Sequence, residues 1–81
     1  MITIYSKPDC SYCVKAKDLM LLRGIPFTEL IMDVGQPKTE GVAYYTVPQL
    51  KEVAPSARTV PQIFENGVLI GGFDSLKKHL G

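Results

Sequence analysis

The chain lacks the features that mark a membrane or nucleic-acid-binding protein. Nine basic and eight acidic residues leave a net charge of +1, which gives no reason to expect nucleic acid or an anionic membrane as a partner. No apolar run is long enough to cross a bilayer. The first residues alternate in polarity instead of following the basic-then-apolar layout of a signal peptide. We therefore expect a cytoplasmic protein with no membrane partner.

Cysteine is scarce too, and its placement is informative. Cys10 and Cys13 are the only two cysteines and form one Cys-Ser-Tyr-Cys run. Structural zinc takes four ligands, and His79 is the only histidine, so no metal site is expected. A purely structural disulfide would close a very short loop and constrain the unfolded chain little. In a reducing cytoplasm such a pair is more often catalytic than structural, so a redox-active dithiol is favoured.

The 81 residues, 46% of them hydrophobic, indicate one small domain, 1–81. Residues 2–5 alternate as a strand, residues 11–23 show helical spacing, and residues 27–32 read as a second strand. Gly24 and Pro26 end the helix between them. A strand–helix–strand unit of this length predicts that its two strands are parallel.

The second half is less regular. Residues 33–45 show no clear period and are expected to form a loop. Asn66-Gly67 between apolar residues predicts a β-hairpin within residues 63–70. Residues 74–80 read as a short helix with Asp74 as its N-cap. A mixed four-stranded sheet with helices on its faces packs these elements most economically.

One tetrapeptide, Thr-Val-Pro-Gln, occurs at residues 46–49 and again at 59–62. The first copy precedes apolar residues at helical spacing, so Thr46 and Gln49 are expected to form a capping box, with Pro48 in the first turn. Because a residue before proline resists the α region, the helix could also start one or two residues later. The second copy leads into the hairpin, where a proline at the start of a strand is tolerated.

Three motifs together resemble the glutaredoxins, in order and spacing, over most of the chain. They are Cys-Ser-Tyr-Cys at residues 10–13, Ala-Arg-Thr-Val-Pro-Gln-Ile-Phe at 57–64 and Gly-Gly-Phe-Asp at 71–74. The ending also resembles glutaredoxins of tailed phages. The resemblance implies an α/β thioredoxin fold, with sheet order 2-1-3-4 and three helices, and glutathione as the reducing partner. It also implies a cis Val60–Pro61 bond, whereas Val47–Pro48 is expected to be trans.

The resemblance assigns roles by position. Cys10 matches the nucleophile and Cys13 the resolving thiol. Lys7 matches the basic residue that meets the glycine carboxylate of glutathione, and Arg58 adds charge. Ser11 stands where the commonest dithiol members carry proline, residues 35–45 are hard to align, and Gln49 is only a candidate ligand. The positions implied to bind glutathione are Lys7, Tyr12, Thr59, Val60, Pro61, Gly72, Phe73 and Asp74.

The predicted chemistry starts at Cys10. A thiol at a helix start faces unpaired N–H groups and the positive end of the helix dipole, which lower a cysteine pKa to roughly 3.5–7.5. The Cys10 thiolate attacks a protein disulfide or a glutathionylated mixed disulfide, and either glutathione or Cys13 resolves the product. Ribonucleotide reductase is a substrate that the family resemblance suggests.

Two alternatives remain open. The protein could be a thioredoxin-like electron donor that a flavoprotein reduces, although Lys7 and the Gly72–Asp74 segment favour glutathione. It could also carry a [2Fe-2S] cluster through Cys10 in a glutathione-bridged dimer, and otherwise be a monomer. Ser11 motivates this second reading, because the backbone there is freer than with proline and regains an N–H.

Overall fold

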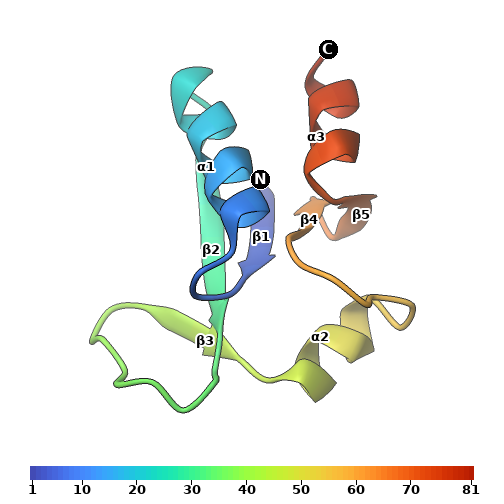
Figure 1. The fold of residues 1–81 in the computed structure, drawn as a ribbon. Coiled ribbons are helices and arrows are strands. Elements are labelled where there is room, and N and C mark those ends of the chain that lie inside the picture. Colours follow the sequence, from blue (N-terminus) through green and yellow to red (C-terminus); the bar gives the residue numbers. More distant parts are fainter.

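The computed structural model describes residues Met1–Gly81. It contains five strands and three helices (Figure 1). Along the chain these are β1 (Ile2–Ser6), α1 (Ser11–Leu22), β2 (Phe27–Met32), β3 (Ala43–Tyr45), α2 (Val47–Val53), β4 (Gln62–Glu65), β5 (Val68–Gly71) and α3 (Phe73–Leu80).

The five strands form one mixed sheet in the order β3-β2-β1-β4-β5. β1 pairs in parallel with β2 and antiparallel with β4, and β4 and β5 form the hairpin. The four longer strands therefore have the predicted 2-1-3-4 order. The expectation of a loop over residues 33–45 was wrong at its end, because β3 pairs in parallel with residues 30–32 of β2. A strand of three residues is too short to show an alternating pattern.

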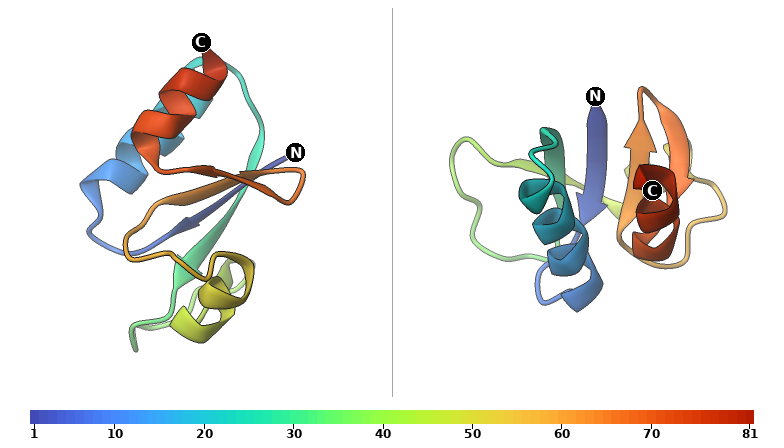
Figure 2. Two further views of the ribbon diagram at one scale, coloured as in Figure 1. Left: turned by 90° about the vertical axis from the view of Figure 1, so that its right-hand side faces the viewer. Right: turned by 90° about the horizontal axis from the view of Figure 1, so that it is seen from above.

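The helices cover both faces of the sheet. α1 and α3 lie together on one face and α2 lies on the other (Figure 2). The α1/α3 face holds a core of Ile2, Ile4, Ala16, Met20, Ile63 and Leu76. The α2 face holds a core of Tyr45, Leu50, Ala54 and Phe64. The alternation of β1 produces this division, because Ile2 and Ile4 face α1 while Tyr5 packs edge-on against Tyr45 and Phe64.

The capping residues show how well the predicted helix boundaries agree with the structure. α1 ends at Leu22 with Arg23 as C-cap, close to the predicted limits. α2 starts directly after its N-cap, Thr46, and the predicted capping box is present. Because it begins at Val47, the later start is excluded. The N-cap of α3 is Gly72 and not the predicted Asp74, which already lies in the first helical turn. A carboxylate there still interacts favourably with the helix dipole.

Local backbone geometry agrees with the remaining predictions. Asn66 and Gly67 both have positive φ, as the tight hairpin turn requires. Val60–Pro61 is cis and Val47–Pro48 is trans, as expected. None of the helices has the length and apolar character needed to cross a membrane.

Candidate functional site

Cys10 and Cys13 lie where β1 gives way to α1. They form a disulfide, with their Cα atoms 5.2 Å apart. Cys10 is the N-cap of α1, and its Sγ accepts a hydrogen bond from the backbone N–H of Cys13 at 3.2 Å. The same N–H would stabilise a Cys10 thiolate after reduction. Cys13 is 1% exposed and Cys10 is 9% exposed, so Cys10 is the more accessible of the two residues.

The segment before β4 lies against this disulfide. The carbonyl oxygen of Val60 is 3.8 Å from the Sγ of Cys10, so the segment of the predicted residues Thr59, Val60 and Pro61 approaches this sulfur at Val60. The Gln62 side chain, which is largely buried, donates a hydrogen bond to the Thr59 carbonyl at 2.7 Å. Gln62 therefore orients this segment. Sequence reasoning missed that role, although the repeated Thr-Val-Pro-Gln contained the signal.

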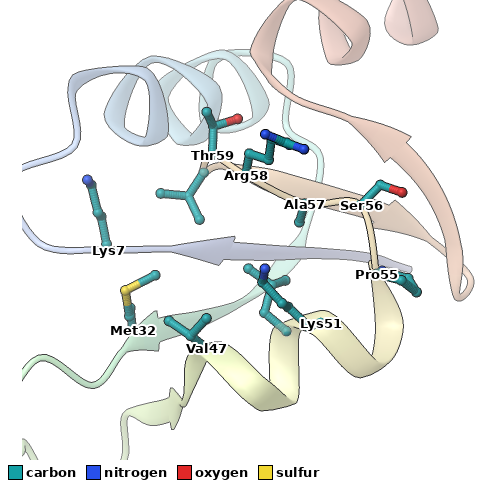
Figure 3. A pocket seen from close by; sticks show the side chains of 11 residues that line it. Lys7, Met32, Val47, Lys51, Pro55, Ser56, Ala57, Arg58 and Thr59 are labelled. Atoms are coloured by element: carbon teal, nitrogen blue, oxygen red, sulfur yellow. The ribbon is translucent and has the colours of Figure 1, made fainter.

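A groove of about 850 Å³ runs between α2 and the segment 55–60 (Figure 3). Three cations from different parts of the chain line it, Lys7, Lys51 and Arg58, and no carboxylate does. Lys7 and Arg58 were predicted for this site, whereas Lys51 was not. Gln49, the other candidate, is used in the α2 capping box and does not line the groove. The remaining lining residues are Met32, Val47, Leu50, Pro55, Ser56, Ala57, Thr59 and Val60.

The turn before α3 approaches the same segment. A Cβ added to Gly72 would lie 3.6 Å from the Pro61 carbonyl oxygen, so this turn packs closely on the cis-proline. The Phe73 ring lies 6.2 Å from the ring of Tyr12, centroid to centroid. These predicted residues are therefore close together in space. Asp74 is different, because its side chain is 85% exposed and its nearest cation is Lys77, at 3.6 Å.

A second cavity, of about 710 Å³, lies on the α1 side of the sheet and is lined by both cysteines. Lys7 lines this cavity and the groove, so the two meet at that residue. The cavity also holds a polar cluster that sequence reasoning missed. Within it, Glu29 Oε2 accepts hydrogen bonds from Ser6 Oγ at 2.6 Å and from Lys17 Nζ at 2.7 Å.

The side chains offer no metal site of their own. No three His, Cys, Asp or Glu residues lie close enough together to hold a metal ion. A [2Fe-2S] cluster needs four ligands, and this chain offers only the two sulfurs of Cys10 and Cys13. The donor set therefore does not fit a cluster held by this chain alone.

Comparison with known proteins shows which family the chain is similar to. A model of the glutaredoxin family matches residues 2–70. Glutaredoxin 3 of Escherichia coli K12 is 38% identical over 76 residues, which are 93% of this chain and 80% of that protein. The hybrid peroxiredoxin hyPrx5 of Haemophilus influenzae is 36% identical over 78 residues, but the chain spans only 28% of its length.

Solved structures agree on the fold. Glutaredoxin 1 from Francisella tularensis, complexed with cacodylate, superposes with a TM-score of 0.71 at 28% identity, covering 98% of this chain and 90% of that one. A buckwheat glutaredoxin–glutathione complex gives a TM-score of 0.63 at 26% identity, covering 98% and 67%. The sheet and helices described above are those of a thioredoxin fold.

Proposed function

Because this chain belongs to the glutaredoxin family, a family of thiol–disulfide oxidoreductases, we propose that it uses glutathione to reduce protein disulfides and glutathionylated mixed disulfides. One observation carries the proposal. Cys10, the more accessible of the two cysteines, has its sulfur at the N-terminus of α1 with a backbone N–H directed at it, beside the Val60 carbonyl. This arrangement stabilises a thiolate and leaves backbone atoms next to it for an extended ligand.

The mechanism assigns one sulfur to attack and the other to resolution. The Cys10 thiolate attacks a disulfide sulfur, forms a mixed disulfide and expels the first thiolate. Glutathione then attacks that mixed disulfide at Cys10, or Cys13 attacks it and forms the Cys10–Cys13 disulfide. Two glutathione molecules return the oxidised pair to the dithiol.

Glutathione is an extended tripeptide with a glycine carboxylate at one end and a γ-glutamyl group, which carries an amino group and a carboxylate, at the other. We place its glycine carboxylate near Lys7 and Arg58, in the groove that contains no acidic lining residue. Its cysteine backbone pairs with the Thr59–Pro61 segment, next to the Cys10 sulfur. Its γ-glutamyl end meets the Gly72–Asp74 turn, with Tyr12 beside Phe73. The buckwheat relative, whose structure is a glutathione complex, supports this choice of ligand.

The compartment, the electron donor and the oligomeric state are proposed on the basis of this function. We propose a reducing, cytoplasmic compartment, since the only cysteines of the chain are this exchangeable pair. Reduction by a flavoprotein is the competing electron source, and the cationic groove favours glutathione. No observation favours ribonucleotide reductase over other disulfide-containing substrates. The protein is proposed to act as a monomer. A cluster-bridged dimer would need Cys10 of two copies and two glutathione thiols as ligands, and no observation favours that assembly.

Single cysteine variants test the proposal. Cys10→Ser should abolish all thiol exchange, because it removes the attacking sulfur. Cys13→Ser should keep the removal of glutathione from a mixed disulfide but lose dithiol reduction of a protein disulfide. The measurement is turnover with glutathione and glutathione reductase as donors, set beside turnover with thioredoxin reductase. Activity with the flavoprotein and none with glutathione would contradict the proposed donor, and equal loss in both variants on the glutathionylated substrate would contradict the assigned roles.

A further inference from the structure

A carboxylate occupies a position on β2 where the fold calls for an apolar side chain. Glu29 is in register with Ile4 of β1, and Ile4 belongs to the core beneath α1 and α3. Residues in register on parallel strands point to the same face, so Glu29 lies on this face too. Its side chain is only 25% exposed. Partial burial of a carboxylate is costly unless it is paired, which makes Glu29 a feature to explain.

Only one of the two carboxylate oxygens is engaged by the protein. Oε2 accepts from Ser6 Oγ and from Lys17 Nζ, and these contacts fix the carboxylate in place. Oε1 accepts no hydrogen bond from any other residue, and it is not buried, because no buried side-chain oxygen or nitrogen lacks a partner. The free oxygen can therefore accept a proton.

The surroundings of Glu29 connect it to the buried sulfur. Glu29, Ser6, Lys17 and Cys13 all line the 710 Å³ cavity. Lys17 follows Cys13 by four residues on α1, so both project from the same helix face. Cys13 is 1% exposed, and burial disfavours the charged thiolate relative to the neutral thiol. A protonated thiol is a poor nucleophile, so the resolving step requires a group that takes its proton.

We propose that Glu29 accepts the proton of Cys13 during the resolving step, directly or through one water in the shared cavity. This inference rests on the proposed function, since it concerns the second half of that reaction. Ser6 acts as the positioning residue that holds the carboxylate against the sheet, and Lys17 adds an ion pair that the step does not require. Glu29 has no role in the first attack, because Cys10 at the helix terminus is stabilised as a thiolate by the Cys13 backbone N–H.

The step balances as follows. Cys10 is joined to the substrate sulfur in a mixed disulfide. The Cys13 S–H bond breaks, its proton passes to Glu29, and its sulfur attacks the Cys10 sulfur. The bond between Cys10 and the substrate breaks, and the electron pair leaves on the substrate thiolate. Glu29 then returns the proton to that thiolate or to solvent. Cys10 and Cys13 are oxidised, and the substrate disulfide is reduced.

Other charged or titratable groups line the same cavity. The turn between β1 and α1 contributes Lys7 and Asp9, α1 contributes Lys17, and β3 contributes Tyr44. Asp9 is the only other carboxylate among them, and it is exposed. Glu29 is thus the carboxylate that the fold holds in a defined position inside the cavity.

The test separates the two sulfur steps in one experiment. Reduced protein is mixed in a stopped-flow instrument with dithiobis(nitrobenzoate), a disulfide that releases one coloured thiolate on Cys10 attack and a second on Cys13 attack. In Glu29→Gln the rate of the first phase should be unchanged. The rate of the second phase should fall about tenfold or more at pH 7, a loss that removal of a general base can cause. The loss should shrink as rising pH ionises Cys13 directly. Glu29→Asp should recover most of the rate.

Two further variants distinguish proton transfer from a merely structural ion pair. Lys17→Met removes the ion pair but keeps the carboxylate and its hydrogen bond from Ser6 Oγ, so the second phase should stay within about twofold of wild type. Glu65→Gln, which removes a carboxylate paired with the N-terminus away from the cavity, should change neither phase. An unchanged second phase in Glu29→Gln, equal slowing of both phases, or the same slowing in Lys17→Met would overturn the inference. Absence of even the first phase in wild type would instead overturn the proposed function.

Discussion

Replacing Tyr45 by phenylalanine should weaken the connection between β3 and the strand that leads to the cysteines. The Tyr45 side chain is 2% exposed, and its hydroxyl donates a hydrogen bond to the Ser6 carbonyl at 2.8 Å. Phenylalanine keeps the edge-on packing with Tyr5, so the loss is that of the hydroxyl alone. A buried carbonyl left without its donor costs about 1–3 kcal/mol. For a chain of this size, each kcal/mol lowers Tm by about 4–8 °C.

The same hydroxyl makes stability depend on pH in a defined direction. Burial, with a smaller contribution from Tyr5, raises the pKa of Tyr45 from 10.0 to about 12. In the unfolded chain the phenol ionises first, so the unfolded state holds fewer protons between these values and stability falls as pH rises. This ionisation does not reduce the free energy of unfolding below pH 10, and it reduces that free energy progressively between pH 10 and pH 12. The two-unit difference corresponds to about 2.7 kcal/mol.

Urea unfolding of the oxidised protein between pH 8 and 12 measures this effect, since disulfide-bonded cysteines do not ionise. Tyr45→Phe should be less stable than wild type at pH 8, and the gap should close as pH rises. The control is Tyr44→Phe, the same chemical change one residue earlier in β3, where the hydroxyl instead accepts the Thr39 N–H. Identical pH slopes for wild type and Tyr45→Phe would refute the argument.

Two further predictions concern the glycine turn and the groove. Gly71→Ala should destabilise the protein by about 2–3 kcal/mol in chemical unfolding, because φ is +127° and the new Cβ would lie 2.7 Å from Ser75 Oγ. Gly67→Ala, also at positive φ but with nothing within 4 Å, should cost only about 1 kcal/mol; equal costs would show that the contact is unimportant. Lys7→Gln should raise KM for a glutathionylated substrate about two- to fivefold, with a smaller change in kcat, and the effect should shrink with added salt. The control is Lys78→Gln on α3, and a salt-independent loss of kcat alone would contradict a binding role for Lys7.

Most of the fold could be predicted because its elements have regular patterns or specific end signals. The spacing of Cys13, Ala16 and Met20 predicts α1, and these are its buried residues. The Asn66-Gly67 pair predicts the hairpin from backbone geometry alone. In both cases the decisive interactions are local, so a short window of sequence contains them.

The predictions failed where the deciding contact is distant in sequence. β3 exists because its residues pair with β2 and because Tyr45 fills the core beneath α2. Glu29 reads as an ordinary polar residue until Ser6 and Lys17, far along the chain, are placed against it. Residue type alone predicts Asp74 as the N-cap of α3. The N-cap is Gly72, which lies close to the Pro61 carbonyl, a contact that the local sequence does not reveal.

The repeated Thr-Val-Pro-Gln shows why residue identity alone does not determine a role. In both copies the glutamine side chain reaches back to its threonine. At residues 46–49 the Gln49 amide oxygen accepts the Thr46 N–H at 2.8 Å, which caps α2. At residues 59–62 the Gln62 amide nitrogen donates to the Thr59 carbonyl, next to the cis-proline. The flanking residues make the difference, because Leu50 and Val53 continue at helical spacing while Ile63 and Phe64 enter a strand. One local motif thus caps a helix in one place and orients the segment beside Cys10 in the other.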